Sequence, residues 1–184
     1  MVTRIIQNSH AEHSFVDAST SELAAARHVK SGMVCVLPAQ GAFNLEAFPQ
    51  NATNEGGDCT ISADGVATTL LAVHFATPPS LDEAFSDSVR ANARLGGAIE
   101  WMGHPSAADS APPTNLPHFR ILRLQGDAGG QPTYLRLAMA EQGGWFVQQM
   151  VFAPLANANE AETKAGEQWR AMISNLAPAN GPHS

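Results

Sequence analysis

The sequence predicts an α+β fold, in which an antiparallel β-sheet of about five to seven strands is flanked by helices. Short runs of apolar and β-branched residues end at Gly, Pro or Asp, as strands do. Several connections between these runs are short and contain Asp-Gly or Gly-Gly pairs, which hairpin turns require. Near the end of the chain, apolar residues recur with the spacing of one helix face, so a helix should cover the sheet.

The length and charge of the chain limit its partners. Its 184 residues fit one domain with a single core. Charged residues make up 15% of the sequence, and the net charge of −7 leaves no basic stripe that could neutralise phosphates. The apolar runs are shorter than the roughly 20 residues that cross a bilayer. We therefore expect neither a nucleic-acid partner nor a membrane span.

Three parts are expected along the chain. Residues 1–17 show no sustained periodicity and should form a flexible or surface-laid arm. Residues 18–176 should form the single α+β domain, and 177–184, rich in Pro and Gly, a flexible tail. The first residues lack the apolar core of a signal peptide, so the protein is cytoplasmic or has lost a leader. Its cysteine pair and lysine-poor surface favour an extracytoplasmic, periplasmic place.

One helix and four strands are expected in the first half of the chain. Ser19 and Glu22 form a Ser-x-x-Glu capping box, which predicts a helix over 20–29. Asp64-Gly65 is a strong hairpin signal and joins two of the strands. The expected strands are 33–37, 43–47, 58–63 and 66–75.

The second half should begin with a helix and continue as a meander. A capping box of Ser80 and Glu83 opens a helix that should run to Arg94, before a glycine pair. In the middle strand of the meander, alternate residues should face opposite sides of the sheet, with Leu135, Leu137 and Met139 on one side. Tyr134, Arg136 and Ala138 should lie on the other. The expected strands are 98–102, 118–125, 132–141 and 145–152.

The last helix should run over 160–176. Asn159 is its expected N-cap, with Glu162 at the third position after it. Four apolar residues follow at i, i+3, i+4 and i+7, so this stripe should lie on the sheet. They are Trp169, Met172, Ile173 and Leu176.

The two cysteines, Cys35 and Cys59, leave two interpretations open. They form no Cys-x-x-Cys motif, and no histidine lies within zinc-ligand spacing of either, which disfavours a metal or redox centre. Both fall in strands expected to belong to one sheet, where opposite side chains can be joined by a disulfide. The alternative is a pair of buried free thiols.

The Pro-rich segment 103–117 is the one long loop, and loops of this kind often carry function. His104, Asp109 and His118 lie in it or beside it and form a candidate loop site. No motif for a nucleophilic serine, a phosphate-binding loop or a dinucleotide site occurs in the chain. We therefore assign no catalytic residue, no cofactor and no metal ligand.

The order of elements resembles that of the Mog/PsbP-like proteins, which are α/β/α sandwiches around an antiparallel sheet. The segments that carry the likeness are 31–38, the helix from Ser80 to Arg94, and 144–147. The resemblance implies a non-catalytic accessory or binding protein and, for bacterial members of that group, an extracytoplasmic place. It implies no site residues, because no functional motif aligns.

Two functional hypotheses remain. The first is a non-catalytic protein-binding domain, because the fold pattern is complete without the cluster of titratable groups that active sites need. The second is a small-molecule binder or hydrolase that uses the loop 103–117 as a lid. A concave pocket with convergent polar groups would favour the second hypothesis.

Overall fold

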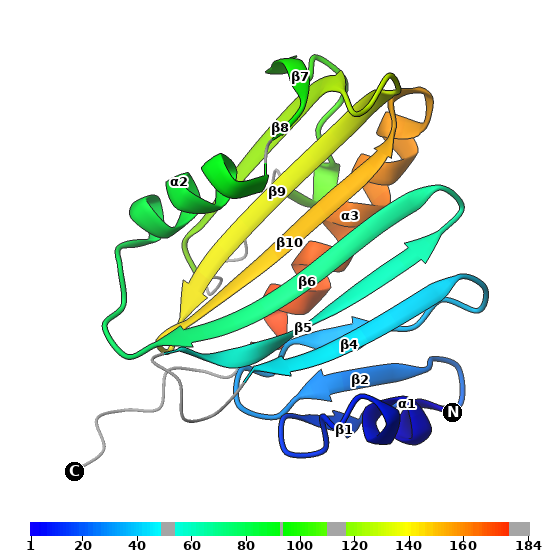
Figure 1. Cartoon of the computed structure of the whole chain (residues 1–184), viewed down its shortest axis with the longest axis vertical. Coiled ribbons are helices and arrows are strands. Elements are labelled where there is room, and N and C mark those ends of the chain that lie inside the picture. The colour runs from blue at the N-terminus through cyan, green and yellow to red at the C-terminus, as the bar shows by residue number, and fades with distance from the viewer. Residues whose placement is uncertain (49–53, 93, 110–116, 177–184) are drawn as a thin grey trace.

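The computed structural model describes residues 1–48, 54–92, 94–109 and 117–176. An antiparallel sheet of seven strands, in the order β4-β5-β6-β10-β9-β8-β7, forms the centre of the molecule (Figure 1). This confirms the predicted α+β fold with an antiparallel sheet. The strands are β4 (Ala42–Phe48), β5 (Asn54–Ala63), β6 (Val66–Phe75), β7 (Gly96–Glu100), β8 (Phe119–Asp127), β9 (Pro132–Gln142) and β10 (Trp145–Pro154).

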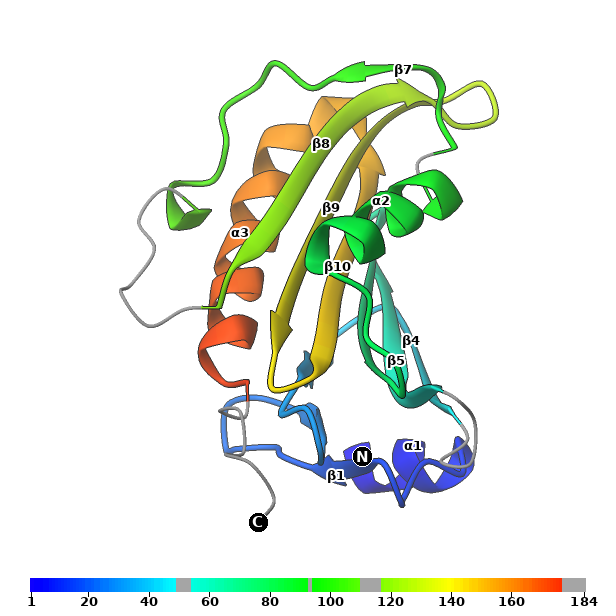
Figure 2. The ribbon, with the colours of Figure 1, turned by 90° about the vertical axis from the view of Figure 1, so that its left-hand side faces the viewer.

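Two helices lie on opposite faces of this sheet (Figure 2). Helix α3 (Ala158–Ser174) packs against β9 and β10, and α2 (Leu81–Asn92) lies across β8 and β9 on the other face. A small sheet of β1 (Phe15–Asp17), β2 (Ala25–His28) and β3 (Val34–Val36) sits at one end with helix α1 (Val2–Asn8). Short 3-10 turns, η1 (Ala107–Asp109) and η2 (Leu155–Asn157), complete the elements.

The Asp64-Gly65 hairpin was predicted correctly. Asp64 has φ of 52° and Gly65 has φ of 75°, the left-handed values that a type I′ turn requires at both central positions. The turn joins β5 and β6 in register, with Ala63 opposite Val66. Because the turn fixes the register, every side chain of β6 has a defined face of the sheet.

The apolar stripe of α3 is buried on the sheet, as the sequence predicts. Trp169 is 1% exposed, and Met172 and Ile173 are nearly as buried. The start of this helix differs from the prediction, because Asn157 rather than Asn159 is the N-cap and makes no side-chain cap. The capping box of α2 is present, since Glu83 accepts hydrogen bonds from Ser80 and donates its own amide to the Ser80 hydroxyl.

The predicted helix over 20–29 is wrong. Residues Ala25–His28 form β2, the central strand of the small sheet. The hydroxyl of Ser19 accepts a hydrogen bond from the amide of Ala25, so it starts a strand rather than a helix. Ser and Thr hydroxyls offer the backbone turns that compete with helix formation, and pairing with two neighbouring strands decides the outcome.

Residues 1–17 contain regular structure, α1 and β1, instead of the expected flexible or surface-laid arm. Val2 and Ile6 on α1 and Phe15 on β1 are buried. The phenyl ring of Phe15 lies so close to Gly57 of β5 that a Cβ there would come within 2.7 Å of it. The small sheet therefore packs directly on β5. The predicted tail, 177–184, lies outside the described residues.

Candidate functional site

The three residues of the candidate loop site lie in different surroundings. His104 and His118 are exposed, whereas the Asp109 carboxylate binds the guanidinium groups of Arg123 and Arg136. Within the described residues, no three His, Cys, Asp or Glu side chains are placed to hold a metal ion. Residues 110–116 of the loop lie outside the described part of the chain.

Asp109 instead belongs to a buried charge cluster between α3 and the meander. Arg136 on β9 donates one amino group to Glu162 at 3.0 and 3.1 Å and to Asp109 at 2.8 Å. The Glu162 side chain is fully buried, and it also accepts hydrogen bonds from Arg123, from the Tyr134 hydroxyl and from the amide of Ser106. Two arginines and two carboxylates make the charge cluster neutral.

The pKa values of this charge cluster suit a structural role. Burial alone would raise the pKa of Glu162, but Arg136 and the three other donors lower it below its ordinary value. The pKa of Tyr134 is raised by burial and by Glu162, so its proton stays in place. Groups held in one protonation state do not shuttle protons near neutral pH. The charge cluster fastens the segment from Ser106 to Asp109 to the sheet.

Sequence reasoning missed this charge cluster because its two central residues had ordinary explanations. Glu162 matched a capping-box position, and Arg136 was one residue in an alternating strand. The alternation of the strand did contain a signal for the charge cluster. It places Arg136 on the same face as Tyr134, in a strand that has neighbouring strands on both sides. A charge on a covered face requires a buried partner.

One hollow surface of the molecule lies elsewhere, along the side of α3. Two adjoining hollows of about 320 and 560 Å³ share Ile61, Thr68, Lys164 and Gln168 as lining. We call this surface the α3 groove. Its other lining residues are Leu23, Val34, Val36, Pro38, Ala63, Asp64, Val66, Val151, Asn157, Glu160, Ala161, Ala165, Glu167, Ala171, Met172 and Asn175.

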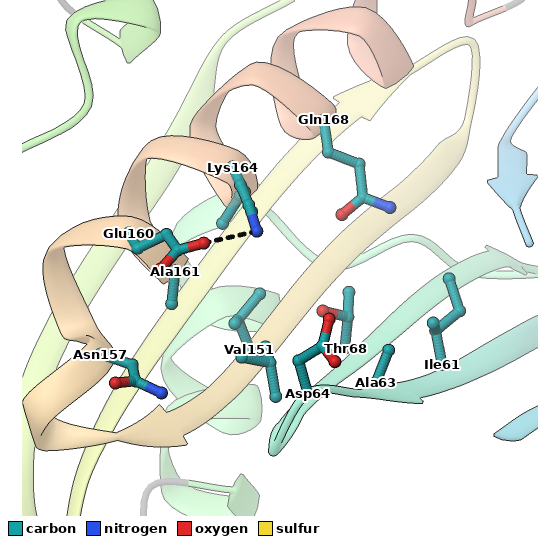
Figure 3. A pocket seen from close by; sticks show the side chains of 12 residues that line it. Ile61, Ala63, Asp64, Thr68, Val151, Asn157, Glu160, Ala161, Lys164 and Gln168 are labelled. Atoms are coloured by element: carbon teal, nitrogen blue, oxygen red, sulfur yellow. Dashed lines mark ion pairs between the residues drawn. The ribbon is translucent and has the colours of Figure 1, made fainter. Parts of the chain in front are cut away.

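The α3 groove exists because α3 covers β9 and β10, while the small sheet packs on β5 farther from the hairpin turn, so a hollow remains beside Ile61, Val66 and Thr68 near that turn. Figure 3 shows Lys164 and Gln168 on the helix across from Thr68 and Asp64 on the β5–β6 hairpin. Lys164 pairs with Glu160 at 2.6 Å, and both side chains are about 70% exposed. The floor is apolar and the rim is polar and charged.

A second hollow, of about 480 Å³, lies on the opposite face between α2 and the sheet, and we call it the α2 pocket. Its lining is mainly apolar, and it contains two carboxylates, Asp58 and Asp87. Burial, and then the negative charge of Glu46, raise the pKa of Asp58 to about 6. The other lining residues are Thr69, Leu71, Val73, Phe75, Pro79, Ala84, Ser88, Ala91, Asn92, Met139, Phe146, Gln148 and Met150.

Cys35 and Cys59 are joined by a disulfide, with their Cα atoms 6.4 Å apart. The two strands belong to different sheets, which corrects the expectation of a single sheet. The bond therefore ties β3 of the small sheet to β5 of the large one. It lies in the core, where both cysteines are fully buried, and so carries no accessible thiol chemistry.

No helix in the described ranges is long and apolar enough to cross a membrane. No protein-family model and no curated protein matches the chain.

Two solved structures show a distant likeness. LpqN of Mycobacterium tuberculosis, which is involved in cell envelope biogenesis, has a TM-score of 0.44 and 9% identity, over 75% of this chain and 86% of LpqN. A protein of unknown function, PA94 of Pseudomonas aeruginosa, has a TM-score of 0.40 and 12% identity, over 86% of this chain and 96% of PA94. Likeness at this level carries no argument about what this chain binds.

Proposed function

We propose that the protein is a non-catalytic binding module, and that it holds a segment of a partner protein in the α3 groove. The observation that carries the proposal is the groove that runs between α3 and the hairpin end of β5 and β6. An apolar floor inside a polar rim is the anatomy of protein interfaces. A segment with one apolar side would place that side on Ile61 and Val66 and its polar side beside Glu160 and Lys164.

The shape of the α3 groove favours an elongated occupant. It follows α3 from Asn157 near the start of the helix to Asn175 just past its end, and it reaches β3 of the small sheet. Leu23, which is 44% exposed, extends the apolar lining at that end. Amphipathic segments bind such grooves through apolar side chains spaced along one face.

The second hypothesis, a small-molecule binder or hydrolase with the loop 103–117 as its lid, has less support. In the described part of this loop, the Ser106 amide and the Asp109 carboxylate are held by the buried charge cluster. A lid has to open, and the elements that move in proteins are drawn from their weakly held parts. Opening here would expose paired buried charges.

We further propose an extracytoplasmic place and a kinship of fold with the Mog/PsbP-like group. The Cys35–Cys59 disulfide supports the first proposal, because such bonds persist in oxidising compartments. The antiparallel sheet between two helices supports the second.

Paired variants on β6 test the binding function, because adjacent residues of a strand face opposite sides of the sheet. Thr68 lines the α3 groove and Thr69 lines the α2 pocket. Tagged wild type, Thr68→Glu and Thr69→Glu would each be used to capture proteins from an extract of the source organism. We expect a partner that binds wild type and Thr69→Glu but is lost with Thr68→Glu.

A second variant of the α3 groove shows whether loss of the partner is due to the groove and not to misfolding of Thr68→Glu. Gln168→Arg changes the opposite wall of the α3 groove from the helix and should also release the partner. Circular dichroism and thermal unfolding would show that each variant is folded. If no captured protein depends on both Thr68 and Gln168, the α3 groove is not the binding site.

A further inference from the structure

We propose that the α2 pocket is a second binding site, which takes an apolar ligand carrying a primary amine, with the ammonium group on Asp58. This site is independent of the α3 groove, because the sheet separates the two. Its volume of about 480 Å³ falls in the usual range of small-molecule sites. Leu71, Val73, Phe146 and Met150 give it an apolar wall on which a hydrocarbon chain can pack.

The charge of the lining selects the class of ligand. Both ionisable residues that line the α2 pocket are acidic, and no Lys, Arg or His contributes to it. Asp87 already pairs with Arg90 at 3.1 Å on the exposed rim. Asp58 has no hydrogen bond and no ion pair with any described residue, so a cation in the pocket would find one free carboxylate.

The surroundings of Asp58 strengthen this selection. Glu46 on β4 lies directly opposite it in the sheet, while β6 presents Leu71 on its other side. Asp87 on α2 is the remaining titratable group in the lining. The carboxylates of Asp58 and Glu46 repel each other, and an ammonium group at Asp58 would relieve that repulsion. The carboxylate of a fatty acid would instead increase the repulsion.

Helix α2 can let such a ligand in, because it is held loosely. None of its residues is fully buried, in contrast to α3. The polar side-chain contacts between the described residues of α2 and the sheet are a hydrogen bond of 2.5 Å from Ser88 to Gln148 and an exposed ion pair of 2.8 Å from Arg120 to Asp82. Elements with few buried apolar contacts open most readily.

Three probes with the same chain test the proposal on the full-length protein. Decylamine, decanol and decanoate, each below the concentration at which it aggregates, would be titrated by calorimetry near neutral pH. We expect decylamine to bind about tenfold more tightly than decanol, since an ion pair with a partly buried carboxylate is added, and decanoate to bind least. Equal binding of all three, or of none, overturns the proposal.

Two matched variants assign the effect to one carboxylate. Asp58→Asn should weaken decylamine binding about tenfold and leave decanol binding unchanged, because it removes the charge and keeps the shape. Asp87→Asn, on the rim and already paired, should change either affinity less than about twofold. If Asp87→Asn has the larger effect, the ammonium group is not on Asp58.

Wild-type protein supplies a readout without any substitution. Because the pKa of Asp58 is about 6, its carboxylate becomes protonated as the pH falls below that value. Decylamine stays charged, so its affinity should fall about fivefold between roughly pH 7.5 and 5, while decanol binding stays constant. A decylamine affinity that does not change with pH would contradict the ion pair with Asp58. Thr68→Glu should leave all three probes unaffected, which separates this site from the α3 groove.

Discussion

At the scale of single residues, the Arg136–Glu162 pair shows why a buried charge needs its partner. Both side chains are fully buried, and the guanidinium of Arg136 donates hydrogen bonds to both carboxylate oxygens of Glu162. Such a pair adds little net stability over an apolar pair of the same volume, but removing one charge leaves the other without compensation. A substitution that removes one charge of the pair should therefore lower the free energy of unfolding strongly.

Glu162→Gln should lower the free energy of unfolding by about 3–5 kcal/mol, because it leaves Arg136 charged and short of a carboxylate. Urea unfolding monitored by tryptophan fluorescence measures this. The control is Glu160→Gln, two residues earlier on the same helix, where the side chain is exposed and a change within about 0.5 kcal/mol is expected. Equal effects of the two variants would mean that the charge cluster is not a structural support.

His28 makes stability depend on pH. It is 2% exposed, its Nδ1 lies 2.9 Å from the Ser31 hydroxyl, and its ring packs between those of Phe15 and Trp145. Burial lowers its pKa from 6.5 to about 4, although Glu55 acts in the opposite direction and Lys30 adds to the lowering. The unfolded chain therefore binds the proton more readily than the folded protein between these two values.

Because of this difference in proton binding, His28 does not reduce the free energy of unfolding above about pH 6.5, but it reduces it progressively as the pH falls toward 4. Asp58, with its raised pKa, acts in the opposite direction, so the comparison is between wild type and His28→Gln. Wild type should lose on the order of 2–3 kcal/mol more than the variant between these pH values. Parallel stability curves for the two proteins would contradict this assignment.

At the scale of elements, the sequence predicts correctly those features that depend on residues close together in the chain. The Asp64-Gly65 turn, the capping box at Ser80 and the α3 stripe each depend on residues close in sequence, and all three were predictable. The helix expected over 20–29 failed because strand pairing with β1 and β3 overrides helix propensity. Burial of α1 could not be predicted either, since Val2, Ile5 and Ile6 span little more than one helical turn, which is too short for a sustained periodicity.

The contact between α3 and the segment before η1 is an element-scale feature with a clear test. Gly166 of α3 faces Ser106 so closely that a Cβ would lie 2.2 Å from its hydroxyl oxygen and 2.3 Å from its Cβ. Gly166→Ala should therefore destabilise the protein by about 1–3 kcal/mol in thermal or urea unfolding, despite the better helix propensity of alanine.

A compensating change makes this prediction specific. Adding Ser106→Gly to Gly166→Ala removes both clashing atoms and should restore most of the lost stability. If the double variant is no more stable than Gly166→Ala alone, the loss arises within the helix and not at its contact with Ser106.

At the scale of the whole molecule, the disulfide joins the two sheets. It closes a loop across a sequence separation of 24 residues, and a link of that span contributes roughly 3–3.5 kcal/mol by restricting the unfolded chain. Mass spectrometry of unreduced, denatured protein after treatment with an alkylating reagent should find neither cysteine modified. Modification of both would mean reduced thiols and would remove the main support for an extracytoplasmic place.

The candidate sites were less predictable than the fold, for a physical reason. The α3 groove and the α2 pocket are spaces left between elements, and their shapes depend on how far each helix covers the sheet. Asp58 lies on β5, Thr68 on β6 and Gln168 on α3, and no spacing in the sequence links them. The loop site around Asp109 was proposed from sequence proximity, whereas the partners of Asp109 come from β8 and β9.

The measurement that tests the binding function most directly is site-specific photo-crosslinking from adjacent residues of β6. A photoreactive amino acid at position 68 faces the α3 groove, and the same amino acid at position 69 faces the α2 pocket. In extract of the source organism, we expect position 68 to give a discrete crosslinked partner that Gln168→Arg abolishes, and position 69 to give none. The same partner from both positions, or none from position 68, would contradict a binding module built around the α3 groove.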